Sequence, residues 1–378
     1  MVVYKKCHPV KRMAFLLSAA AFSVDLFHNN LFPVNMHIFL SNEHAGLLQP
    51  FTLLREAFSM RMGIFTPWER YHLVKGLTLA DGPGEQVTTI PANRVISFKG
   101  LEEMLEQGSG LPHENNYRTL WHAADMVKHN DWAIREDFNW IVSHGASEPL
   151  PGTVTAINPA QIFIEKGARI SHCTINAETG PVYIGNDAGI MEGCLLRGPL
   201  AIGNNAVIKM GAKIYGATTI GPYCMAGGEI KNSILMGYSN KAHDGYLGDS
   251  VLGEWCNLGA GTSNSNIKNT AGEIMLYAEE EPYNAGTKCG LVMGDYSRSA
   301  INTSFNTGTV VGICCNVFGA GLTPKYIPNF SWGLSGELYR QDAAVRDVQN
   351  WMALKGKQLE PAQEKALREL YTKWVPIS

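Results

Sequence analysis

The chain has 378 residues, which is enough for two or three domains with well-buried cores. Its formal net charge is −3 and charged residues amount to 17%, so the composition indicates neither a nucleic-acid partner nor a basic membrane-binding face. An anionic ligand would have to be met by a local group of cations.

The first 35 residues allow two interpretations. Basic residues between positions 5 and 12 precede the apolar run MAFLLSAAAFSV, which is the layout of a secretory signal, although the run is too short to span a bilayer. Alternatively, translation starts at Met36, which opens the strand-like MHIFLS, and residues 1–35 are an extension with no role in the fold. We favour the second interpretation, which agrees with the cysteine pattern.

The chain contains eight cysteines: Cys7, Cys173, Cys194, Cys224, Cys256, Cys289, Cys314 and Cys315. No C-x-x-C spacing occurs, and most of them fall at or near inward positions of the repeat described below. We therefore expect small buried thiols in a reducing compartment, rather than disulfides or metal ligands. This predicts a cytoplasmic protein.

Residues 36–150 predict a reduced α/β domain. Strands are expected at Met36–Leu40, Val87–Ile90 and Arg94–Phe98. Between Tyr117 and Ile141 apolar residues recur at helical spacing, so we place one or two amphipathic helices there. Pro149 and Pro151 mark the end of the domain.

Residues 151–333 predict a parallel β-helix of hexapeptide repeats, because an aliphatic residue returns every six residues with a small residue four places after most of them. The sixfold positions run Ile184, Ile190, Leu196, Ile202, Ile208, Ile214, Ile220 and Ala226. In such a solenoid each unit supplies one strand and one corner, and three units close a triangular coil of about 18 residues. The molecule is therefore expected to be mainly β.

Two interruptions break the repeat. After a two-residue slip we expect the phase to resume at Ile234, Asn240, Tyr246, Leu252 and Leu258. From Asn264 to Cys289 the period is lost in a charged, tyrosine-containing stretch, which we expect to protrude from one corner as a functional loop. The period returns at Met293, Ser299, Phe305, Val311 and Val317.

Residues 334–378 change to helix formers, and Pro361 suits the first turn of a helix. C-terminal helices would cap the open end of the solenoid, which otherwise exposes strand edges and apolar filling.

The stretch SNKAHDGYLGDSVLGEWCNLGAGTSNSN gathers polar residues from consecutive coils, which could converge along one groove. His243 interrupts a run of small and apolar residues there. Imidazole can take a proton from an amine or hydroxyl near neutral pH, so His243 is a candidate general base. The alternative is a histidine that caps a corner or bonds a neighbouring carbonyl.

From His243 to Asn266 the chain resembles, without a gap, the acetyltransferase half of the bifunctional N-acetylglucosamine-1-phosphate uridyltransferase/glucosamine-1-phosphate acetyltransferase. That half is a left-handed β-helical homotrimer acting on acetyl-CoA and an amino-sugar phosphate. The resemblance implies that His243 deprotonates the sugar amine for attack on the thioester. It also implies that Tyr246, Asn257 and Asn266 hold the sugar phosphate.

Two lysines resemble that family less closely. Lys231 stands where the family has a phosphate-binding lysine once a gap is allowed, and Lys241 is one place off. The alternative for both is a solvated surface lysine. The family's basic residues just after the second asparagine are not matched by NIKNTAGE.

From Met36 to about Trp332 the chain resembles more closely the GlmU-like sugar nucleotidyltransferases of bacteria, which join a reduced N-terminal domain to the same helix. FTLLREAFSMRMGIFTPWERY is similar to that group's N-terminal signature at Thr52, Arg55, Arg61, Gly63, Thr66 and Glu69. Arg55 and Arg61 could bind a nucleotide phosphate, or they could be surface or domain-contact arginines. Nucleotidyl transfer would also need Mg²⁺, but no GxGTR-like loop with a following PK pair is present.

These observations predict an acyltransferase that moves acetyl from acetyl-CoA to an amino-sugar 1-phosphate, with nucleotidyl transfer as a second possible activity. The alternative is a non-catalytic trimer that binds nucleotide sugars or acts as a scaffold. A zinc enzyme is disfavoured because zinc needs about three His or Cys ligands, and the solenoid has two separated histidines, His172 and His243.

Overall fold

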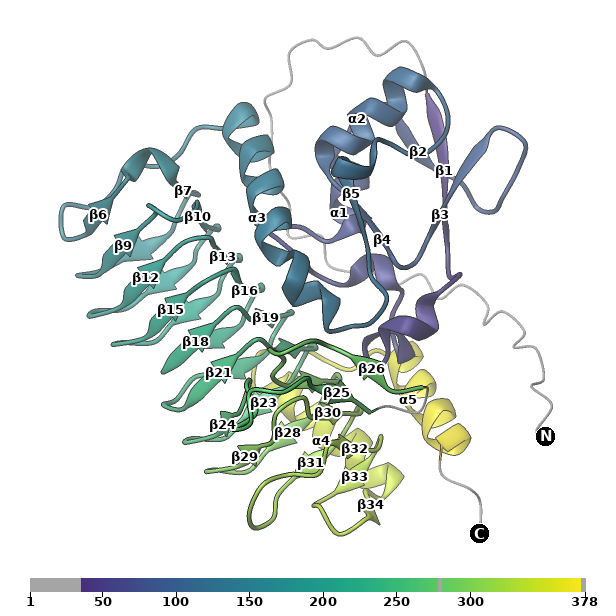
Figure 1. Cartoon of the computed structure of the whole chain (residues 1–378), viewed down its shortest axis with the longest axis vertical. Helices are drawn as coiled ribbons and strands as arrows, with labels where there is room; N and C mark the ends of the chain where they lie inside the picture. The colour runs from purple at the N-terminus through teal and green to yellow at the C-terminus, as the bar shows by residue number, and fades with distance from the viewer. Residues whose placement is uncertain (1–34, 278–280, 375–378) are drawn as a thin grey trace.

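The computed structural model describes residues 35–277 and 281–374, and the expectations for residues 1–34 lie outside this part of the chain. Figure 1 shows a long β-helix with an α/β domain packed along one side and two C-terminal helices near its lower end. The expected mainly β architecture, a β-helix with a smaller α/β domain and C-terminal helices, is therefore confirmed.

The N-terminal domain has one small parallel sheet, in which β1 (Met36–Ser41) lies between β2 (Leu77–Leu79) and β3 (Val87–Pro91). A second pair, β4 (Arg94–Ile96) and β5 (Tyr117–Thr119), is antiparallel. The α-helices of this domain are α1 (Pro67–Leu73), α2 (Phe98–Gln107) and α3 (Asp125–His144). Short 3-10 turns are η1 (Ala45–Leu48), η2 (Phe51–Leu53), η3 (Ala57–Ser59) and η4 (Glu114–Asn116), with η5 (Pro159–Gln161) at the start of the solenoid.

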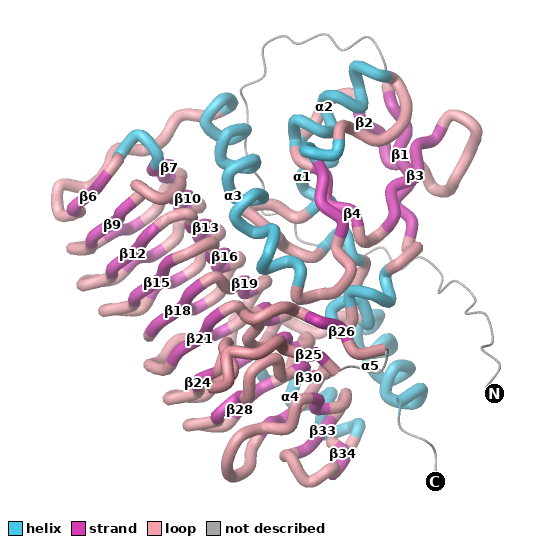
Figure 2. Tube along the Cα trace, viewed as in Figure 1, coloured by secondary structure: helices cyan, strands magenta, loops and turns pink. Residues whose placement is uncertain are grey.

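The β-helix has three faces, which we name from what lies on each (Figure 2). The α3 face contains β7 (Ile162–Ile164), β10 (Val182–Ile184), β13 (Leu200–Ile202), β16 (Thr218–Ile220), β19 (Ile234–Leu235), β22 (Val251–Leu252), β27 (Val292–Met293), β30 (Val310–Val311) and β32 (Tyr326–Ile327). The α4 face contains β8 (Arg169–Ile170), β11 (Gly189–Ile190), β14 (Val207–Ile208), β17 (Met225–Ala226), β20 (Asn240–Lys241), β23 (Asn257–Leu258), β28 (Arg298–Ser299), β31 (Asn316–Val317), β33 (Ser331–Trp332) and β34 (Glu337–Leu338). The Tyr246 face contains β6 (Thr155–Ile157), β9 (Thr174–Asn176), β12 (Leu195–Arg197), β15 (Lys213–Tyr215), β18 (Glu229–Lys231) and β21 (Tyr246–Gly248), and it continues with β24 (Ser263–Asn264) and β29 (Ser304–Phe305).

Two of the faces are covered by helices. On the α3 face, outward side chains such as Tyr183 and Val251 are buried in one core with the N-terminal domain. On the α4 face, α4 (Gln341–Ala353) lies over β28, where the Arg298 guanidinium stacks on the Trp351 ring at 5.2 Å. The following helix, α5 (Pro361–Trp374), begins at Pro361 as predicted.

The interior follows the sixfold repeat from the first coils to Ala226. The ladder pairs Ile184 with Ile202 and Ile202 with Ile220, eighteen residues apart, and these side chains are fully buried. After the insertion the predicted inward residues Met293 and Val317 are likewise buried. This part of the prediction is confirmed.

The phase predicted after Ala226 is wrong by one residue over one coil. The inward residues are Leu235, Lys241 and Leu247, whereas Ile234, Asn240 and Tyr246 point outward. The cause is a shortened coil: the ladder pairs Ile220 with Leu235, fifteen residues on rather than eighteen. The sequence showed that a slip occurs but not which neighbouring residue turns inward after it.

The insertion between β24 and β27 leaves the corner between the Tyr246 face and the α3 face. It forms a short hairpin, β25 (Met275–Leu276) and β26 (Tyr283–Asn284), that packs on the start of α3. The Tyr283 ring stacks on His122 at 4.8 Å, and its hydroxyl donates to Asp125 at 2.7 Å. The insertion therefore ties the solenoid to the N-terminal domain.

The seven cysteines of the described residues are free and buried. Within the same residues, none of the helices has the length and apolar character needed to cross a membrane.

Candidate active site

His243 lies at the corner between β20 and β21, where the chain passes from the α4 face to the Tyr246 face. Its side chain is exposed, and among the described residues no hydrogen bond or ion pair holds the ring. The preceding coil passes very close here, since a Cβ on Gly228 would lie 2.7 Å from the His243 carbonyl oxygen. The imidazole is thus presented to solvent by a tightly stacked turn.

Three of the predicted substrate-binding residues gather on the Tyr246 face. The Tyr246 ring lies along its own strand, so that a Cβ on Gly248 would meet the Tyr246 hydroxyl at 2.2 Å. Lys231 pairs with Gly248 across the ladder, and the Asn266 amide donates to the Tyr246 hydroxyl at 3.1 Å. The structure therefore brings the Tyr246 hydroxyl and Asn266 together at the Gly248 end of β21, away from His243. Lys231 lies beside this end in the ladder, with its ammonium over the Tyr215 ring of the preceding coil at 5.5 Å.

Asp249 organises this group and was not among the predicted site residues. Its carboxylate accepts a hydrogen bond from the Asn266 amide and another from the Asn232 amide at 3.3 Å. Burial, together with Asp249, raises the pKa of Tyr246, so its hydroxyl stays protonated and can donate at neutral pH. The LGD triplet in the sequence was the available signal.

Asn257 lies apart from the other predicted residues. It is on the α4 face, where its amide oxygen accepts from Asn240 at 3.3 Å. The Lys355 ammonium, just beyond α4, donates to Asn240 at 2.9 Å. Within one chain, Asn257 therefore faces a different direction from Tyr246 and Asn266.

Lys241 is neither a solvated surface residue nor a candidate phosphate ligand, and both interpretations offered for it are corrected by the structure. Its side chain points into the β-helix and is 1% exposed. The ammonium donates to the Gly227 carbonyl at 3.2 Å and to the His243 carbonyl. Burial lowers the pKa of Lys241 to about 8, although Asp244 opposes this change.

Two further lysines lie near Asn266 and were missed in the sequence. The Lys325 ammonium donates to the Thr307 carbonyl, and the Thr307 hydroxyl meets that of Ser265 at 2.6 Å. Burial lowers the pKa of Lys325, and so does the nearby positive charge of Lys268. Neither lysine forms an ion pair within the described residues, so this region carries unneutralised positive charge. Lys325 is too distant in the sequence for any local pattern to connect it with Asn266.

A cavity of about 270 Å³ adjoins this group on the side of the N-terminal domain. It lies between α3, the insertion and the corner that carries Asn232 and Asp249, and Lys128 and Lys288 contribute to its lining. Asp249 is therefore shared between the cavity and the Tyr246–Asn266 contact.

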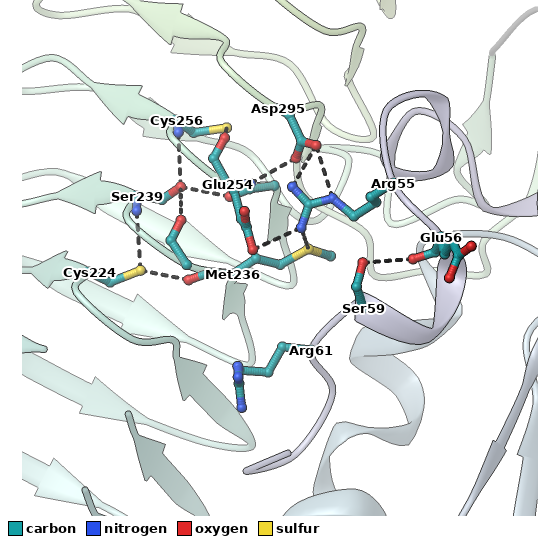
Figure 3. Close-up of polar contacts among 12 residues, drawn as sticks. Arg55, Glu56, Ser59, Arg61, Cys224, Met236, Ser239, Glu254, Cys256 and Asp295 are labelled. Carbon is teal, nitrogen blue, oxygen red and sulfur yellow. Dashed lines mark hydrogen bonds and ion pairs between the residues drawn. The ribbon is translucent and has the colours of Figure 1, made fainter. Parts of the chain in front are cut away.

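Arg55 forms a buried contact between the N-terminal domain and the solenoid, shown in Figure 3. Its guanidinium pairs with Asp295 at 2.6 Å and with Glu254 at 3.0 Å. Burial by itself would lower the pKa of Arg55, but these two carboxylates outweigh burial and raise it. A nucleotide could reach this guanidinium only by displacing its carboxylates.

The rest of the N-terminal signature is also used internally. Arg61 pairs with Glu69 at 2.8 Å, and Thr66 and Glu69 form the capping box of α1. The Gly63 amide donates to Asn130 of α3 at 2.8 Å. These contacts explain the signature as part of the packing of the domain, and nucleotide binding by Arg55 and Arg61 stays a prediction.

No group of three or more His, Cys, Asp or Glu side chains that could hold a metal ion occurs among residues 35–277 and 281–374.

No protein-family model matches the chain. Parts of it are similar to curated proteins named "Bifunctional protein GlmU", with 36% identity over 84 residues to that of Methanococcus aeolicus (22% of this chain, 20% of the relative). The protein of the same name from Methanocaldococcus jannaschii is 30% identical over 117 residues, which are 31% of this chain and 28% of the relative. A "Bifunctional sugar-1-phosphate nucleotidylyltransferase/acetyltransferase" of Sulfurisphaera tokodaii is 31% identical over 91 residues (24% and 23%). The resemblance to GlmU-type proteins is confirmed, and the chain spans less than a third of the length of these relatives.

Solved structures give weaker likenesses. An Arabidopsis UDP-N-acetylglucosamine acyltransferase aligns with 59% of this chain and 89% of its own, at 14% identity and a TM-score of 0.21. A GDP-perosamine N-acetyl transferase of Caulobacter crescentus aligns with 78% and 90%, at 11% identity and a TM-score of 0.15. Scores this low carry no information about function.

Proposed function

We propose that the protein is a transferase that moves an acetyl group from acetyl-CoA to the amine of an amino-sugar phosphate or nucleotide sugar. The observation that carries the proposal is the arrangement along β21. An exposed histidine precedes this strand, the Tyr246 hydroxyl meets Asn266 at its far end, and Lys231 lies beside that end in the neighbouring strand. The names of the curated relatives support acetyl transfer in sugar-nucleotide chemistry.

In the proposed reaction the sugar amine attacks the thioester carbonyl of acetyl-CoA. The new C–N bond forms as the C–S bond breaks, and the His243 imidazole takes the proton released by the amine and passes it to the CoA sulfur, so that CoA leaves as the thiol. Such a base contributes on the order of 10²–10⁴ in rate. His243 is suited to this because its ring is exposed while its backbone is fixed.

The acceptor would lie along the Tyr246 face. Tyr246 and Asn266 would donate to its hydroxyl or phosphate oxygens, and Lys231 would pair with its phosphate. Lys268 and Lys325 add positive charge beside Asn266, in the absence of the basic residues expected from the resemblance. Acetyl-CoA would lie in a groove between neighbouring chains of a homotrimer, which also stays a prediction.

The test is His243→Ala, with His172→Ala as the matched control. His172 is an exposed histidine on the same edge of the solenoid, in its first coil. Thiol release from acetyl-CoA with glucosamine, galactosamine and related 1-phosphates should fall at least about tenfold in His243→Ala and stay unchanged in His172→Ala. Equal turnover in both variants would remove His243 from the mechanism.

A non-catalytic scaffold or nucleotide-sugar-binding trimer is the second candidate, favoured by the position of Asn257 on another face and by the paired Arg55 and Arg61. Calorimetry with acetyl-CoA separates the two, because a scaffold has no reason to bind it.

Nucleotidyl transfer is tested separately by pyrophosphate release from UTP or dTTP with a sugar 1-phosphate and Mg²⁺.

A further inference from the structure

Lys241 occupies a position that the fold otherwise fills with apolar or small side chains. In the same inward row, the ladder places Ala226 before it and Leu258 after it. An ammonium in this place is desolvated, which costs free energy unless its donors are used. The question is therefore why the Gly227 and His243 carbonyls accept hydrogen bonds from this ammonium.

Two other coils show how this corner normally satisfies its inward carbonyls. The Cys194 thiol donates to the Lys209 carbonyl in the next coil at 3.1 Å, and the Thr262 hydroxyl donates to the Ala300 carbonyl at 3.1 Å. Each donor comes from the residue four places after an inward residue. The carbonyl that accepts this hydrogen bond belongs to the next coil of the solenoid.

The coils around His243 lack these donors. Gly227 follows Lys209 in the ladder, but the residue equivalent to Cys194 is Ala212, which has nothing to donate. In the coil before that of His243, the ladder places Gly228 level with Ala212, and Gly228 has no side chain to donate to the His243 turn. Within the described residues, the recorded hydrogen bonds to the Gly227 and His243 carbonyls come from Lys241.

We propose that Lys241 is a positioning residue, which holds the His243 turn through its carbonyl and so fixes the imidazole for proton transfer. This inference rests on the proposed role of His243 as base. Because no other described side chain holds the ring, the backbone of the turn is what sets the Cα position from which the imidazole projects. An error of about 1 Å at a reacting group can cost on the order of 10² in rate.

The anchoring is tested first without any reaction. Lys241→Met keeps the length and the apolar stem but removes the three donors, and Lys213→Met, an exposed lysine on the Tyr246 face, is the control. Hydrogen exchange of a peptide covering Ala242–Gly248 should accelerate about tenfold or more in Lys241→Met alone. Exchange unchanged from that of the native chain would overturn the anchoring, whatever the protein catalyses.

Kinetics then separate positioning from general stability. At a temperature where both proteins are fully folded, Lys241→Met should lower kcat about tenfold or more and leave KM for acetyl-CoA within about twofold. Adding Lys241→Met to His243→Ala should cost nothing further, because both changes act through one group. A full additive loss in the double variant would contradict the inference. If His243→Ala itself is active, the proposed function fails while the exchange result still stands.

Discussion

At the scale of single residues, the buried ammonium of Lys241 sets an unusual dependence of stability on pH. Burial lowers its pKa to about 8, with Asp244 acting in the opposite direction. An unfolded lysine titrates near ~10.4, so between these values the unfolded chain binds more protons than the folded one. Stability contributed through Lys241 therefore rises as the pH rises through this window.

We predict that the free energy of unfolding of the native chain, relative to that of Lys241→Met, increases by about 2 kcal/mol from pH 7.5 to pH 9.5. Urea denaturation of both proteins at the two pH values measures this difference. A difference that stays constant, or falls, would show that the lysine is not desolvated in solution.

Single residues are also where sequence reasoning was least complete. His243, Tyr246 and Asn266 follow a contiguous motif, so a resemblance could identify them. Lys325 comes close to Asn266 only through the stacking of coils. Lys241 looked like any exposed lysine, because its inward orientation depends on a change of phase that the letters do not specify.

At the scale of elements, a buried ion pair joins the N-terminal domain to the β-helix beside the apolar core that the two share. This pair links Arg55 to Asp295, whose carboxylate is 1% exposed. Removing one member of a buried ion pair leaves the other uncompensated, which costs about 3–5 kcal/mol.

Arg55→Met should therefore lower the free energy of unfolding by about 3–5 kcal/mol while leaving the Tyr246 face intact. Denaturant unfolding measures the loss, and Arg135→Met, which removes a half-exposed partner of Asp131 within α3, is the control with a loss below about 1 kcal/mol. If Arg55→Met instead unfolds like the control and weakens nucleotide binding, the nucleotide role predicted from the signature is favoured.

The insertion hairpin gives a second prediction at this scale. Burial, helped by Lys128 and opposed by Asp125, lowers the pKa of His122 to about 4. Because an unfolded histidine titrates near ~6.5, the stability contributed by the neutral ring is lost as the pH falls from about 6.5 toward 4, by up to about 3 kcal/mol.

His122→Phe keeps an aromatic ring against Tyr283 but cannot titrate. Its urea midpoint should fall less between pH 7 and pH 5 than that of the native chain. Identical pH dependence in the two proteins would exclude His122 as the group responsible.

Elements were also what the sequence predicted best. The strands at Met36–Leu40 and Val87–Ile90, a helix between Tyr117 and Ile141 and the early coils follow period-2, period-3.6 and period-6 patterns, whereas α1, α2, β2 and β5 were not predicted. The sequence did not show which residue turns inward in the shortened coil, because Ile234 and Leu235 are both apolar and hydrophobicity alone does not distinguish them. The hairpin of the insertion was missed because its contacts lie on α3, far away in the chain.

At the scale of the whole molecule, the separation of Asn257 from Tyr246 has a consequence for assembly. In one chain the two residues face different directions, so a site that uses both requires a second copy. In a cyclic trimer such a site would combine His243 of one chain with Asn257 of its neighbour.

Mixing His243→Ala chains with Asn257→Arg chains tests this. If both variants are inactive alone, co-refolded equal mixtures should recover about a quarter of native turnover, because each mixed trimer keeps one intact boundary in three. Sedimentation confirms that trimers form. No recovery from mixed trimers would place the site within a single chain.

The shortened coil has a last consequence, for the position of the turn that carries the imidazole. Met210, Gly228 and His243 occupy successive levels of one edge, and the Met210 side chain is 68% exposed. At the middle level the shortened coil carries only glycine, and a Cβ there would lie 2.7 Å from the His243 carbonyl oxygen, so the two turns stack this closely only on glycine. In a relative with a full-length coil, a side chain at the level of Gly228 would press on the His243 carbonyl and displace the turn, even where the histidine is kept.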